Sequence, residues 1–132
     1  MIYKHLRFLI LDDIHAHTAQ IEKMLNLLGC YRIATATTAE EGALLSEACG
    51  KRFDVVIASE RVLDLHYQNS VAENFYINHL FIYSCTSREA HAKVQARGTS
   101  CYKSGLPEFH VLEKFIASLE VASCSCVRYT DV

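Results

Sequence analysis

The chain has 132 residues, of which 51% are hydrophobic, and its 13 basic and 15 acidic residues give a net charge of −2. This length is that of one ordinary domain that can bury a sizeable core. Because the charges are nearly balanced and no Lys/Arg block is present, direct nucleic-acid binding is not expected.

Neither a membrane span nor an export signal is expected. The apolar runs are all far shorter than the roughly 18 residues that a membrane span needs. The N-terminus lacks the apolar region and small-residue cleavage site of a signal peptide. We therefore expect a cytoplasmic protein without membrane association, whose six cysteines are reduced thiols.

Short apolar segments alternate with helical patterns along the chain. Strands are expected over residues 6–11, 31–36, 53–58, 80–83 and 100–103. Helices are expected over residues 15–28, 38–50, 86–98 and 107–121, with a weakly marked helix between residues 59 and 78. The helix over residues 107–121 begins at Pro107, a residue suited to a first helical turn. Residues 1–122 are expected to form one domain, and residues 123–132, without readable periodicity, a tail or the start of a linker.

Five buried strands that alternate with helices predict an α/β fold with a doubly wound parallel sheet. The common strand order for such a flavodoxin-like domain is 2-1-3-4-5, which places the carboxyl ends of strands one and three side by side. The residues expected at this edge are Asp12, Asp13, Ser59, Glu60, Ser84 and residues 103–106.

The first strand ends in Asp12-Asp13, the third reads Asp-Val-Val-Ile-Ala, Ser84 follows the fourth, and Gly98-Thr-Ser-Cys-Tyr102 precedes the last helix. In this order, these motifs resemble the receiver domain of two-component response regulators. The resemblance covers about residues 6–121. It implies that Asp12 and Asp13 correspond to a metal-binding acidic pair, Ser84 to a phosphoryl-contacting hydroxyl and Tyr102 to a switch aromatic.

The departures from the family pattern fall on its chemistry. Ser59 stands where the phosphoaccepting aspartate is expected, and Gly105 stands where the family has a lysine. A serine hydroxyl is a poor nucleophile without a neighbouring base, and it is a weaker Mg²⁺ ligand than a carboxylate. We therefore expect a pseudo-receiver that binds Mg²⁺ weakly at most. Ser59→Asp should raise Mg²⁺ affinity several-fold if the rest of the pocket is intact.

Other roles are open for these polar residues. Asp12 and Asp13 could be loop acids or helix N-caps. Glu60 could occupy the place of the missing aspartate, although a shift of one residue along a strand usually reverses the side chain's direction. Lys103 could substitute for the missing lysine from two positions upstream. His15-Ala-His17 could bind a transition metal, but a solvated turn is the simpler interpretation.

The leading functional hypothesis is a phosphorylation-independent signalling domain, not an enzyme, that binds another protein. The partner would be a histidine kinase, an output domain, another regulator or a second copy of the chain. Interface candidates are Lys93, Arg97, Tyr102 and Lys103, with Glu113 and Lys114 on the last helix.

Two alternative functions belong to other classes. One is a working phosphotransfer receiver whose acceptor is Ser59 or Glu60. The other is a small flavodoxin-like enzyme or cofactor binder, although no Gly-rich phosphate loop follows the first strand.

Overall fold

The computed structural model describes residues 5–49, 53–63, 78–84 and 100–130. Five strands form one parallel sheet, in the order β2-β1-β3-β4-β5. The strands are β1 (Arg7–Leu11), β2 (Arg32–Ala36), β3 (Val55–Ser59), β4 (His79–Ser84) and β5 (Ser100–Ser104). The predicted fold class and strand order are therefore confirmed, and the strand boundaries differ from the expected ones by one or two residues.

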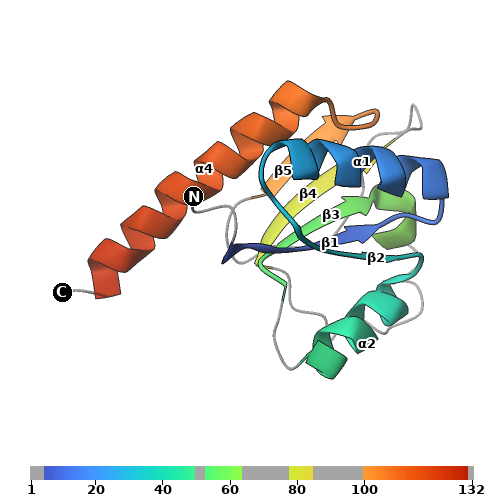
Figure 1. Cartoon of the computed structure of the whole chain (residues 1–132), viewed down its shortest axis with the longest axis horizontal. Helices are drawn as coiled ribbons and strands as arrows, with labels where there is room; N and C mark the ends of the chain where they lie inside the picture. The colour runs from blue at the N-terminus through green and yellow to red at the C-terminus, as the bar shows by residue number, and fades with distance from the viewer. Residues whose placement is uncertain (1–4, 50–52, 64–77, 85–99, 131–132) are drawn as a thin grey trace.

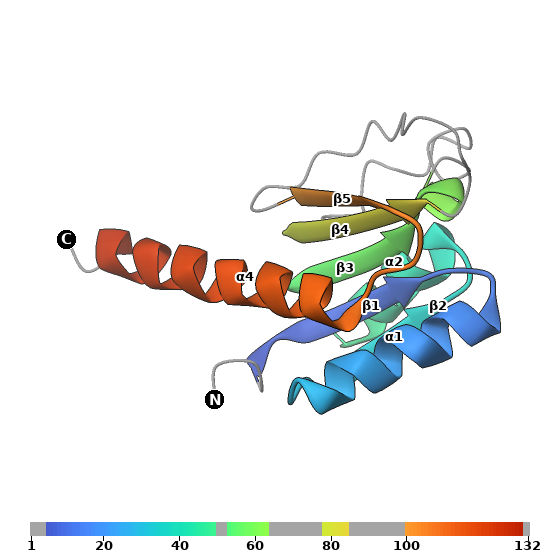
Figure 2. The ribbon, with the colours of Figure 1, turned by 90° about the horizontal axis from the view of Figure 1, so that it is seen from above.

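Helices cover both faces of this sheet (Figures 1 and 2). They are α1 (His15–Leu27), α2 (Ala39–Cys49) and α4 (Phe109–Thr130), and residues 60–63 are also helical. Helices α1 and α4 lie on one face and α2 lies on the other. The end of α1 is set by Gly29, whose φ of +89° favours glycine. The start of α2 is capped, because Thr38 Oγ1 accepts a hydrogen bond from the Glu41 backbone N–H at 3.1 Å.

The central strands are buried on both faces, as their continuous apolar sequences predict. Alternate residues of each strand enter two separate hydrophobic clusters. The cluster under α1 and α4 contains Phe8, Ile10, Val55, Ile57, Phe81 and Tyr83 from the strands and Ile21, Leu25, Leu112, Phe115, Ile116 and Leu119 from the helices. Cys30 is a free thiol in the same cluster, and burial raises its pKa to about 11, so it is a neutral core residue.

Helix α4 departs from the sequence prediction at both ends. It begins at Phe109, so Pro107 precedes the helix instead of starting it, and the Glu108 carbonyl accepts the backbone N–H groups of Val111 and Leu112. The helix then continues to Thr130, through most of the segment expected to be a tail. Its second half extends past the amino ends of the strands (Figures 1 and 2). The division into residues 1–122 and 123–132 stays a prediction.

Two further predictions fall on parts of the chain outside the described residues. These are the helix over 86–98, with Lys93 and Arg97, and most of the segment between residues 59 and 78. Within the described residues, no helix is both long enough and apolar enough to span a membrane.

Candidate functional site

The carboxyl edge of the sheet brings together the residues that the sequence predicts there. Ser59 ends β3 and pairs in register with Tyr83 of β4. Because Val55 and Ile57 lie in the cluster under α1 and α4, the two-residue period of a strand places Ser59 on that same face. Asp12, one residue after β1, contacts Tyr83 there. Ser59 therefore ends its strand next to the Asp12 site.

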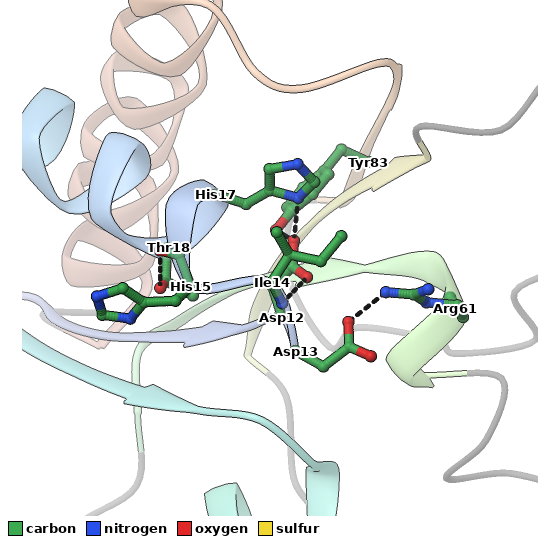
Figure 3. A network of polar contacts seen from close by, with 8 residues as sticks. All are labelled: Asp12, Asp13, Ile14, His15, His17, Thr18, Arg61 and Tyr83. Atoms are coloured by element: carbon green, nitrogen blue, oxygen red, sulfur yellow. Dashed lines mark hydrogen bonds and ion pairs between the residues drawn. The ribbon is translucent and has the colours of Figure 1, made fainter.

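Asp12 is almost fully buried and is held by three hydrogen-bond donors (Figure 3). The Tyr83 hydroxyl donates to Oδ2 at 2.6 Å, and His17 Nδ1 lies 2.9 Å from the same oxygen. The backbone N–H of Ile14 donates to Oδ1 at 2.9 Å. Ile14 is the N-cap of α1 and has no side-chain cap bond, so Asp12 forms an Asx turn before the helix and is not its N-cap.

The surroundings of Asp12 favour its ionised form. Burial raises the pKa of this carboxyl, but hydrogen bonds from Tyr83, Ile14 and His17, together with the charge of His17, outweigh burial and lower the pKa below its ordinary value. An ionised carboxylate only accepts hydrogen bonds, so the proton of the His17 contact lies on Nδ1. The second ring nitrogen of His17 points away from Asp12 (Figure 3).

Asp13 lies in a different environment, at the surface of the site. Its Oδ1 forms an ion pair with the guanidinium of Arg61, which comes from the helical turn after β3 (Figure 3). Both side chains are about half exposed, at 45% and 54%. An ion pair this exposed stabilises the fold by roughly 0–1 kcal/mol. The two adjacent aspartates therefore have separate partners, one in the core and one at the surface.

The remaining predicted site residues surround this pair. Ser84 is buried at the end of β4, and its carbonyl accepts a hydrogen bond from the backbone N–H of Gly105. Gly105 has a φ of +88°, a conformation that costs a residue with a side chain roughly 1–2 kcal/mol. The backbone at this position therefore favours glycine over the lysine of the family pattern.

The two candidates on β5 lie on opposite faces of this edge strand. Tyr102 is exposed, whereas Lys103 is half-buried on the same face as Cys101. A partner that binds along the edge could still contact both residues. Glu60 is buried at the start of the helical turn 60–63.

The residues at this edge do not fit a Mg²⁺ ion. Mg²⁺ requires near-octahedral oxygen ligands and carboxylate charge. Here both Asp12 oxygens accept hydrogen bonds, Asp13 is paired with Arg61, and Ser59 contributes no charge. Among the described residues, no three His, Cys, Asp or Glu side chains lie close enough to hold a metal.

A hollow of about 100 Å³ opens beside the acidic pair, between the ends of β1 and β2 and the starts of α1 and α2. Its lining residues are Asp12, Asp13, His15, Thr18, Thr35, Ala36, Thr37 and Glu41. Glu41 and Thr37 are hydrogen-bonded to each other, and the Thr18 hydroxyl donates to the His15 carbonyl. His15 lines this hollow, whereas His17 contacts the Asp12 carboxylate (Figure 3).

Sequence reasoning missed Tyr83 and Arg61 as members of this site, and it named His17 only as a possible ligand of a transition metal. Tyr83 carried a usable signal, because a tyrosine near the end of a buried apolar strand needs a partner for its hydroxyl. The sequence does not say which partner it finds, since Asp12 lies 71 residues away.

Comparisons with known proteins identify the fold. No protein-family model matches the sequence, and no curated protein matches it either. Three of the similar solved structures are named here. The first is the N-terminal domain of a response regulator/sensory box/GGDEF protein from Carboxydothermus hydrogenoformans, with 17% identity, a TM-score of 0.64 and coverage of 91% of this chain and 98% of that one.

The second is a CheY-like receiver domain from Methylobacillus flagellatus, with 14% identity, a TM-score of 0.59 and coverage of 86% and 97%. The third is a response regulator protein from Burkholderia multivorans, with 20% identity, a TM-score of 0.55 and coverage of 87% and 94%. These matches and the strand order together show that the chain has the fold of response regulator receiver domains.

Proposed function

We propose that this chain is a cytoplasmic signalling domain that acts through protein binding, without phosphorylation and without catalysis of its own. The observation that carries the proposal is the state of the acidic pair. Asp12 is satisfied by Tyr83, His17 and the Ile14 backbone, and Asp13 is paired with Arg61. Asp12 is therefore not available to hold a cation beside an incoming phosphoryl group, and Asp13 would first have to release Arg61.

Two other features support the loss of phosphotransfer. The residue at the end of β3 is Ser59, whose hydroxyl is a poor nucleophile at neutral pH without a base. Gly105 has no side chain that could neutralise phosphoryl oxygens, and its positive φ disfavours a lysine there. The acidic nucleophile, an open cation site and the lysine of the family pattern are thus replaced together, while the buried core of the fold is kept.

The edge of the sheet formed by β5 is the proposed contact surface. Tyr102 is 44% exposed, although large aromatic side chains are usually buried. Glu113 and Lys114 are exposed on α4, and Phe115 of the same helix packs edge-to-face on Phe81 of β4, the strand next to β5. Charges of both signs suit a two-fold contact between identical chains, in which basic groups of one copy meet acids of the other. Lys103 of β5 also belongs to the proposed surface, and the sequence adds Lys93 and Arg97, outside the described residues, as interface candidates.

We expect the chain to self-associate in solution, to the same extent with and without a small phosphodonor and Mg²⁺. The measurement is solution mass by light scattering across a concentration series. The Arg97→Glu, Lys103→Glu double variant should associate more weakly than the parent, because it reverses two charges of the proposed surface.

A matched control reverses two charges elsewhere. Lys23 and Arg32 are exposed on α1 and on β2, at the opposite edge of the sheet, so Lys23→Glu, Arg32→Glu should associate like the parent. A parent that stays monomeric at the highest concentration would contradict self-association. Association that appears only with the phosphodonor would contradict the phosphorylation-independent mechanism.

A further inference from the structure

The Tyr83 hydroxyl is bonded to one of the two Asp12 oxygens that could hold a cation. It donates to Oδ2 at 2.6 Å, and His17 donates to the same oxygen at 2.9 Å. A carboxylate oxygen has about two lone-pair directions. Both directions of Oδ2 are therefore taken by protein donors, and one of the two directions of Oδ1 is taken by the Ile14 N–H.

The donors of Asp12 differ in how easily they can be displaced. His17 lies in the first turn of α1 with 20% of its side chain exposed, so its ring can swing into solvent. Tyr83 is fully buried in the cluster under α1 and α4, which includes Phe8 and Ile10. Moving its hydroxyl away from Asp12 would require the ring to leave a close-packed core.

Asp13 is a lesser obstacle to a cation. Its ion pair with Arg61 is about half exposed and therefore weak. A divalent ion at the site could displace the guanidinium into water at small cost. The obstacle that remains is the buried hydroxyl on Asp12.

We propose that Tyr83 is the positioning residue that closes this site to Mg²⁺, independently of the missing acid at Ser59. Ser59→Asp is expected to raise Mg²⁺ affinity only if the rest of the pocket is intact. That condition is not met, because the Asp12 carboxylate is committed to a donor that cannot move aside. The acid at position 59 and the removal of the Tyr83 hydroxyl are therefore both required. This inference concerns cation binding and does not depend on the proposed protein-binding role.

The test is calorimetric titration of Mg²⁺ into the parent and a set of variants. We expect no measurable difference between the parent and Ser59→Asp, and a several-fold higher affinity for Ser59→Asp, Tyr83→Phe. The matched control is Ser59→Asp, Tyr102→Phe, which removes a tyrosine hydroxyl from the neighbouring strand and should bind like Ser59→Asp alone. Circular dichroism establishes that each variant is folded.

Three results would overturn the proposal. One is a several-fold gain in Mg²⁺ affinity for Ser59→Asp alone, because the Tyr83 hydroxyl would then not close the site. Another is a folded Ser59→Asp, Tyr83→Phe protein whose Mg²⁺ affinity is no higher than that of the parent. The third is a gain in Ser59→Asp, His17→Ala, because the mobile imidazole and not the buried hydroxyl would then be the barrier. None of these results bears on self-association.

Discussion

Tyr83→Phe is expected to lower the free energy of unfolding by roughly 1.5–3 kcal/mol at neutral pH, the range for a hydrogen bond to a charged group. The substitution removes the 2.6 Å bond to Asp12 and leaves a buried carboxylate with one donor fewer. The ring stays, so no cavity is created. Chemical denaturation of parent and variant measures the difference. Tyr102→Phe, which alters an exposed tyrosine, should change stability little.

The effect of Tyr83→Phe should depend on pH in a defined direction. Because the pKa of Asp12 is lowered in the folded state, its ionised form contributes stability above the unfolded pKa of about 3.9. That contribution is lost as the pH falls through the folded pKa. The gap between parent and Tyr83→Phe should therefore narrow as the pH falls below about 4. A gap that is the same at neutral and acid pH would mean that the hydroxyl does not act through the charge of Asp12.

Leu112→Ala is expected to have the largest effect, a loss of about 2–5 kcal/mol in the free energy of unfolding. Leu112 is fully buried in the first half of α4, in the cluster that contains Tyr83 and the edge-to-face pair Phe81 and Phe115, whose ring centroids are 5.3 Å apart. Truncation would leave a cavity between this helix and the sheet. The measurement is again chemical denaturation.

Leu27→Ala is the matched control, since it makes the same change in a helix at a side chain that is 69% exposed. It should alter stability by no more than about 0.5 kcal/mol. Equal losses in the two variants would contradict the packing of α4 against the sheet.

The sheet could be predicted because its signals are local. The apolar run of β1, its stop at two aspartates and the capping residue Thr38 before α2 are typical of alternating strands and helices. Right-handed crossovers then leave few possible strand orders. The same logic brings Asp12 and Ser59 to one edge, which the structure confirms.

The partners of Asp12 and Asp13 could not be predicted, because they depend on contacts between residues that are distant in the sequence. The sequence pattern predicts Tyr83 as a buried strand residue and His17 as part of a solvated turn. Only the packing of α1 and β4 against β1 brings both to Asp12. Arg61 reaches Asp13 because the chain turns into a helix directly after Ser59, in the stretch where the sequence pattern is weakest.

The sequence pattern predicts too early an end for α4. The apolar stripe that includes Leu112 and Leu119 packs against the sheet, and beyond it the sequence loses its helical periodicity. Periodicity reports a buried face and not the helix itself. A helix that runs past the sheet therefore gives no such signal.

The most direct test of the account is the intact mass of the parent after incubation with a small phosphodonor and Mg²⁺. A receiver domain that has its phosphoaccepting aspartate serves as the positive control in the same reaction. We expect the control to gain phosphate and the parent to keep its unmodified mass. A stoichiometric mass gain that maps to the peptide containing Ser59 and Glu60 would show a working acceptor and contradict the phosphorylation-independent function.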